Sequence, residues 1–150
     1  MKEAIQTLIT SDKMAHAFEY LKQDEAHTID QQIELVQISS FSPFEEKRAI
    51  RFKELLTEAG LDPVMDEVHN VYAHIHGTGN GPTLYVSAHL DTVFPPETPL
   101  PVKREGTKIY APGIGDDTRG LAEILTLARA IKESGLKPVG DIIIGGNVGE

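Results

Sequence analysis

Apolar residues recur every three or four positions in two segments of the chain, which predicts two amphipathic helices. The first segment holds Ala49, Phe52, Leu55, Leu56 and Ala59. The second holds Leu121, Ile124, Leu125, Ala128 and Ile131. Gly60 and Gly135 follow these segments and predict left-handed caps that end both helices. Ser42, Pro43 and Glu45 have the spacing of a capping box, so we expect the first of these helices to begin at Pro43.

Other segments favour strands. Residues 64–68 and 71–76 alternate between apolar and polar positions and predict two short strands. Residues 83–90 are almost continuously apolar, which is typical of a central strand covered on both faces. Residues 141–146 predict another buried strand, and residues 102–111 predict a small hairpin.

Helices that alternate with buried strands predict an α/β fold, in which helices flank a mixed, mostly parallel sheet. The polar residues 1–28 stand apart from this pattern, and we expect a loosely packed segment there that contains some helix. Residues 29–150 hold the alternating elements. In sheets of this class ligands bind beyond the carboxyl ends of the strands, which points to the stretches that begin at His89 and Asn147.

The 150 residues carry 14 basic and 23 acidic side chains, a formal net charge of −9. An acidic surface repels phosphate, so nucleic acids and anionic membranes are excluded as expected partners. The absence of cysteine excludes disulfides and cysteine-ligated zinc, but not metal sites built from histidine and carboxylate. No apolar run reaches the ~20 residues that span a bilayer, and the amino-terminal residues do not resemble a secretion signal. We therefore expect a cytoplasmic protein.

His89 and Asp91 follow the apolar strand of residues 83–90. Neutral imidazole is a good ligand for zinc, and a nearby carboxylate can accept the other ring N–H and so fix the tautomer. The alternative interpretation is a histidine at a strand end, in a turn that Asp91 stabilises.

Asp116 and Asp117 stand among Gly113, Gly115 and Gly120, just before the second predicted amphipathic helix. Adjacent carboxylates repel each other unless a cation lies beside them, and a divalent ion would relieve this repulsion. The alternative is that these residues only cap the helix. The glycines favour the metal interpretation, because they let the backbone adopt an unusual path.

Glu150 follows the strand of residues 141–146, where a carboxylate could act as general base on water activated by a metal. Taken alone, a glutamate at this position does not indicate a function.

His74 and His76 alternate on one predicted strand and therefore share a face. An exposed strand surface explains this pattern more simply than a metal site does. Arg119 is expected to pair with local carboxylates.

Taken in order, the three clusters resemble the motifs of the dinuclear-zinc metallopeptidases, the family that includes aminoacylases, glutamate carboxypeptidases, dipeptidases and peptidase T. Residues 88–93, Ala-His-Leu-Asp-Thr-Val, are similar to the first motif of that family. Residues 115–124 are similar to the second motif, most closely to that of the peptidase T branch. Residues 148–150, Val-Gly-Glu, are similar to the start of the third. The resemblance runs from about residue 29 to Glu150.

This resemblance implies a zinc-exopeptidase-like fold and two divalent metal ions, zinc first, with cobalt or manganese as alternatives. His89 would ligate one ion, with Asp91 orienting the ring. Asp116 would bridge both ions, with Asp117 as the second choice, and the Asp116–Asp117 peptide bond would be cis. Glu150 would be the general base for a bridging water that attacks a peptide or amide bond in a small peptide or an N-acyl amino acid.

Several family features have no counterpart in these residues: the second glutamate of the third motif, a later carboxylate and histidine ligand, and a smaller lid and dimerisation domain. The resemblance thus implies the N-terminal part of a catalytic domain, an incomplete fold from an enzyme that forms a homodimer. We expect the chain alone to be inactive and to self-associate through the strand of residues 141–146. The alternative function is an inactive, truncated half-domain that serves as a structural or assembly element.

Overall fold

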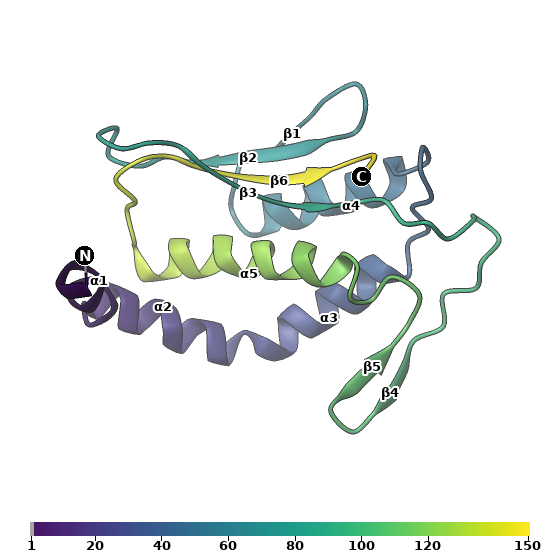
Figure 1. Ribbon diagram of the computed structural model, residues 1–150, viewed down its shortest axis with the longest axis horizontal. Coiled ribbons are helices and arrows are strands. Elements are labelled where there is room, and N and C mark those ends of the chain that lie inside the picture. Colours follow the sequence, from purple (N-terminus) through teal and green to yellow (C-terminus); the bar gives the residue numbers. More distant parts are fainter. Residues whose placement is uncertain (1) are drawn as a thin grey trace.

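The computed structural model describes residues 2–150 and shows helices layered against a small sheet (Figure 1). The helices are α1 (Lys2–Ile9), α2 (Asp12–Gln23), α3 (Glu25–Val36), α4 (Glu46–Glu58) and α5 (Thr118–Ser134). The strands are β1 (Val64–Met65), β2 (Val71–Ile75), β3 (Leu84–His89), β4 (Lys103–Glu105), β5 (Lys108–Tyr110) and β6 (Ile142–Asn147). None of the helices in this range is long and apolar enough to cross a membrane.

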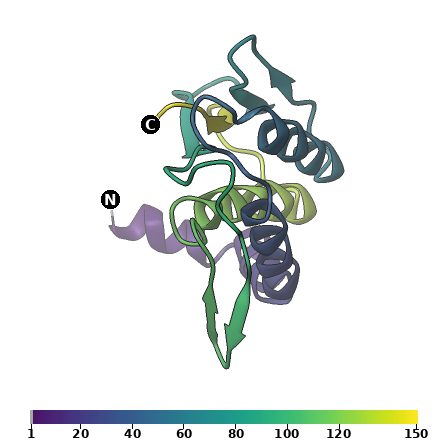
Figure 2. The same ribbon diagram turned by 90° about the vertical axis from the view of Figure 1, so that its right-hand side faces the viewer.

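The main sheet has the strand order β1-β2-β6-β3. β3 runs parallel to β6, whereas the β1–β2 and β2–β6 pairs are antiparallel. The sheet is therefore mixed, as expected, but among the described residues it has two antiparallel strand pairs and one parallel pair, where mostly parallel pairing was expected. β4 and β5 form the predicted hairpin, which projects away from the rest of the molecule (Figure 2). The predicted α/β class is confirmed.

The prediction that residues 83–90 form a central strand is wrong. β3 lies at an edge of the sheet, and β6 occupies the centre. Leu84 and Tyr85 are 57% and 49% exposed, so this strand is not buried on both faces even though its sequence is apolar. One face of the sheet packs on helices, while the other holds the exposed side chains of Tyr85 and His74.

The core lies between the sheet and the helices α4 and α5. Its buried side chains include Phe52, Leu55, Leu56, Val71, Leu90, Leu121, Leu125 and Ile144. α2 and α3 pack in turn on α5, which gives a third layer (Figure 1). This layering matches the apolar spacing of the two predicted helices.

The expectation of a loosely packed start is wrong for α2 and for the first residues of α3. Arg129 of α5 donates hydrogen bonds to Asp24 at 2.5 and 2.9 Å and to Gln31 at 2.7 Å, and all three side chains are buried. The hydroxyls of Thr28 and Thr126 lie 2.5 Å apart in the same interface. The partners are polar, so a search for apolar spacing does not reveal this packing.

The carboxyl ends of α4 and α5 agree with the sequence, whereas the start of α4 does not. Gly60 and Gly135 have φ angles of 81° and 63°, as predicted for left-handed caps. The capping-box prediction is wrong: α4 begins at Glu46, and no side chain caps it. Ser42 and Pro43 instead form a turn with a cis peptide bond between them, so Pro43 lies outside the helix.

The predicted strand of residues 64–68 is shorter than expected. Asp66 ends β1, because its carboxylate accepts hydrogen bonds from the backbone N–H groups of Val68 and Asn70, from the Asn70 amide and from the Tyr72 hydroxyl. These local bonds hold a tight turn that replaces strand pairing.

Candidate metal site

Two parallel strands bring the first and third clusters together. His89 of β3 pairs with Asn147 of β6 at the carboxyl ends of both strands. The Leu90 N–H donates to the Asn147 carbonyl at 2.6 Å, which extends the pairing by one residue. Glu150 lies just beyond, so its side chain reaches the His89 ring.

Three predicted site residues meet at the His89 imidazole. Its Nε2 atom lies 2.8 Å from Asp116 Oδ1 and 3.1 Å from Glu150 Oε2. One ligand atom from each residue lies within 4.8 Å of the other two. His89 is mostly buried, whereas the Asp116 and Glu150 side chains are 88% and 69% exposed. An imidazole nitrogen and two carboxylates therefore face one solvent-accessible point.

Asp91 contacts His89 mainly through its backbone. The Nδ1–H of His89 donates to the Asp91 carbonyl at 3.0 Å, while the Asp91 carboxylate lies 3.7 Å away and accepts from the Glu150 N–H at 3.3 Å. A proton on Nδ1 leaves the Nε2 lone pair of a neutral ring free for a metal. Asp91 is thus placed to fix the ring, although the shorter contact comes from the main chain.

Asp116 and Asp117 have different surroundings. Asp117 accepts hydrogen bonds from the Gly120 N–H at 3.1 Å and from the His89 N–H at 3.2 Å, so it caps α5 and ties that helix to β3. Asp116 points its carboxylate at the His89 ring. The peptide bond between the two aspartates is cis, as the resemblance implied. The alternative that these residues cap the helix holds for Asp117.

Opposing influences act on the pKa of His89. Burial lowers this pKa, but the hydrogen bond to Asp116 and the charges of Glu150, Asp117 and Asp91 raise it, and the net pKa lies above 6.5. The cause is the cluster of carboxylates, which stabilises a positive charge at this point.

Arg48 of α4 supports the site, and sequence reasoning missed it. Its buried guanidinium donates to the Leu90 carbonyl at 2.8 Å and to the Ile38 carbonyl at 2.7 and 3.2 Å. Burial lowers the pKa of Arg48 to about 10, against the opposing charge of Asp91. One signal was available: position 48 lies four residues before Phe52, on the buried stripe of this helix.

A cavity of about 330 Å³ opens beside this group. Its lining includes His89, Asp116 and Glu150 on one side and Phe94 and Ile114 on another. The cavity combines apolar walls with a polar centre, which is typical of a small-molecule site.

Arg119, the remaining candidate residue, forms an ion pair with Glu123 at 2.7 Å, as expected from the sequence.

Residues 85–150 match the profile of peptidase family M20/M25/M40, which covers the His89, Asp116 and Glu150 clusters. Carboxypeptidase G2 of Pseudomonas sp. (strain RS-16) is 38% identical over 77 residues, which is 50% of this chain and 18% of that protein. The uncharacterized protein YqjE of Bacillus subtilis is 27% identical over 128 residues, 76% of this chain and 34% of its own length. The chain thus spans about a third or less of these relatives.

Solved structures of peptidases have a similar fold. A tripeptidase from Staphylococcus aureus has a TM-score of 0.70 and 31% identity, with 84% of this chain and 37% of that chain covered. The aminopeptidase PepT of Bacillus cereus also has a TM-score of 0.70, with 26% identity and 82% and 36% of the two chains covered. The resemblance inferred from the motifs is confirmed.

Proposed function

We propose that this chain, as a relative of the M20/M25/M40 peptidases, provides part of a metal site that hydrolyses a peptide or amide bond. The observation that carries the proposal is the convergence of His89 Nε2, Asp116 and Glu150 within 4.8 Å of one another. Three segments far apart in the sequence supply these groups, and together they place two candidate metal ligands, His89 and Asp116, beside a candidate general base, Glu150.

The donor set fits a divalent ion such as zinc. Zinc sites use imidazole nitrogen and carboxylate oxygen, and sites of this composition also accept cobalt or manganese. Asp116 is 88% exposed and carries two oxygens, so it is suited to bridge two ions, as the resemblance implies. When bound, such ions would lower the pKa of water and polarise the carbonyl of the scissile bond.

The remaining roles belong to the chain itself. The Asp91 carbonyl accepts from the His89 ring and so fixes its tautomer. The Asp117 carboxylate accepts from the His89 backbone N–H and so fixes the end of β3. Glu150 is proposed as the general base that takes a proton from the attacking water. Its carboxylate is exposed beside His89, so it can reach both the cavity and the water it would activate.

Small peptides and N-acyl amino acids are the proposed substrates. The names of the relatives, a carboxypeptidase and a tripeptidase, refer to peptides. The cavity beside His89, of about 330 Å³, is of a size that takes a small ligand. A homodimer of the complete protein is part of the same proposal.

The test is a metal titration of the complete gene product that carries this sequence. We expect zinc, cobalt or manganese to restore hydrolysis of dipeptides, tripeptides or N-acyl amino acids after treatment with a chelator. Glu150→Gln is expected to keep the metal and to lower kcat by at least about 100-fold, as for loss of a general base. Absence of metal-dependent hydrolysis over all three substrate classes would refute the proposal.

A further inference from the structure

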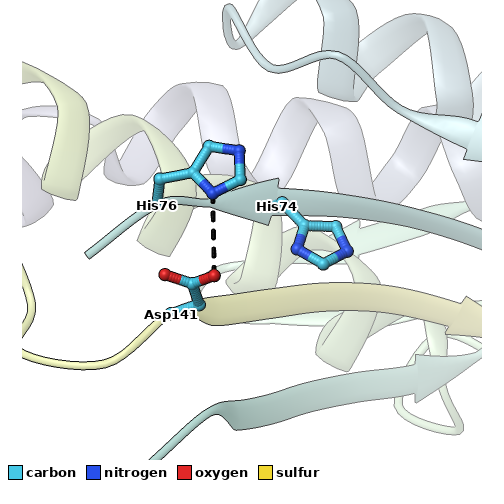
Figure 3. A group of neighbouring side chains, drawn as sticks. All are labelled: His74, His76 and Asp141. Carbon is cyan, nitrogen blue, oxygen red and sulfur yellow. Dashed lines mark ion pairs between the residues drawn. The ribbon is translucent and has the colours of Figure 1, made fainter. Parts of the chain in front are cut away.

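A second group of metal-ligating side chains lies away from the site described above. His74 lies in β2 and His76 directly follows that strand, two residues further along, and Asp141 faces them from the residue before β6 (Figure 3). The His76 Nδ1 atom lies 3.6 Å from Asp141 Oδ2, and the two imidazole rings stack with centroids 5.8 Å apart. The sequence showed that the histidines share a face, but Asp141 is 65 residues further along than His76, and only the fold brings it close.

We propose that His74, His76 and Asp141 form a separate binding site for a divalent transition-metal ion. One ligand atom from each residue lies within 4.8 Å of the other two. Two imidazoles and one carboxylate suit zinc, copper or nickel, whereas magnesium and calcium prefer sites made only of oxygen. A water molecule would take the remaining position of a four-coordinate ion.

The ligand atoms need only a small adjustment to close around an ion. Zinc–nitrogen bonds of about 2.0–2.1 Å place tetrahedral ligands about 3.3 Å apart. The 3.6 Å separation of His76 and Asp141 is already close to that value. The His74 ring must move inward, and both histidines are exposed, so side-chain rotation does not disturb the core.

Asp141 is held in place by the backbone. The Gly77 N–H donates to Asp141 Oδ1 at 2.9 Å, which leaves Oδ2 directed at His76. This hydrogen bond, followed by the charges of His76 and His74, lowers the pKa of Asp141, so its carboxylate is ionised at neutral pH.

Two loops fix the distance between the strands that carry the ligands. The N–H groups of Thr78 and Asn80 donate to the carbonyls of Pro138 and Val139 at 3.0 and 3.1 Å. The loops also touch at Gly140, where an added Cβ would lie 1.9 Å from the Pro82 carbonyl oxygen. Asp141 and the end of β2 are therefore parts of one rigid corner, and an ion bound there would join β2 to β6.

This corner is distinct from the His89 site. Asp141 precedes β6, whereas Asn147, which pairs with His89, ends it. Six residues of strand separate the two positions by about 20 Å. An ion at His74 therefore cannot be shared with His89, and each site can be removed without loss of the other.

Titration calorimetry with Zn²⁺ on the complete protein tests the proposal. The double variant His74→Gln/His76→Gln and the variant Asp141→Asn should each lose at least about tenfold in affinity for one ion, while His89→Gln should retain that ion. The amide oxygen introduced by Asp141→Asn can still accept the Gly77 hydrogen bond, so this variant removes the charge with little disturbance of the loop. Circular dichroism verifies that the variants are folded.

His16→Gln is the matched control, because His16 is an exposed histidine outside both groups. We expect this variant to bind Zn²⁺ as the wild type does. In a complementary measurement, substoichiometric Cu²⁺ should broaden the NMR signals of His74 and His76 before those of His16. Equal stoichiometry and affinity in the wild type and the double variant would overturn the proposal, as would an equal loss in His16→Gln.

Discussion

At the scale of single residues, His89 is the group whose chemistry depends most on its neighbours. Its pKa is raised because the carboxylates around it outweigh the effect of burial. A raised pKa in the folded state stabilises the protein below pH 6.5, and this stabilisation is lost as the pH rises through the folded-state pKa. In metal-free protein, the NMR titration of the His89 ring should therefore have a midpoint above 6.5.

Asp116→Asn should lower that midpoint, because it removes the carboxylate 2.8 Å from Nε2. It should also flatten the fall in the free energy of unfolding with rising pH. A midpoint at or below 6.5 in the wild type would contradict the geometry of the cluster.

Arg48 is a second residue at this scale, and it is expected to contribute strongly to the free energy of unfolding. Arg48→Met removes three hydrogen bonds and leaves the carbonyls of Ile38 and Leu90 without their donor. We expect the free energy of unfolding to fall by about 2–6 kcal/mol, given about 1–3 kcal/mol for each of the two unsatisfied carbonyls. Lys47→Met, an exposed change on the same helix, should cost less than about 0.5 kcal/mol. Urea unfolding measures the free energy of unfolding of both variants. An equal loss in the two would show that the hydrogen bonds of Arg48 do not stabilise the fold.

At the scale of elements, Asp117 joins the start of α5 to β3. Asp117→Ala should lower the free energy of unfolding by about 1 kcal/mol, because an N-cap is lost, whereas Asp117→Asn keeps the cap and should cost a few tenths. Asp117→Asn should also keep metal affinity, in contrast to Asp116→Asn. Thermal unfolding and calorimetry separate these effects. Loss of metal affinity in Asp117→Asn alone would make Asp117, the second choice, the bridging ligand.

The elements also show what the sequence can predict. The apolar stripes of α4 and α5 and the glycines that end them are local signals, so both helices were predicted well. The start of α4 follows a cis Ser42–Pro43 turn that short-range capping rules do not include. α2 and α3 pack through a buried polar network around Arg129, which apolar periodicity cannot detect.

The same division applies to the site. The rule that ligands bind beyond parallel strand ends pointed to the stretches that begin at His89 and Asn147, whereas Asp116 was expected at the site only from the family resemblance. The sequence left open whether Asp117 caps α5. It could not show that the Asp91 backbone holds the His89 ring or that Asp141 reaches His76. Each of these contacts depends on the register of strands and on loop positions that are set by the whole fold.

At the scale of the whole molecule, β1 and β3 are the edge strands of the main sheet, and β3, with six residues against two, is the longer. The expectation of self-association was placed on residues 141–146, but β6 has a partner strand on both sides. The open edge of β3, with Leu84 57% exposed, is the surface that can pair with another copy. Leu84→Lys should therefore reduce association of the 150-residue chain, as measured by light scattering over a range of concentrations. Thr83→Lys is a nearby control just outside the strand. A monomeric wild type would contradict this prediction.

The central claim is that His89, Asp116 and Glu150 surround a catalytic metal. The most direct test is anomalous diffraction at the zinc edge from crystals of the complete protein, with His74→Gln/His76→Gln present to remove the second site. We predict a peak about 2.0–2.2 Å from His89 Nε2 and from an Asp116 carboxylate oxygen, with Glu150 beside it. The absence of a peak there, in protein whose hydrolytic activity depends on zinc, would contradict the account.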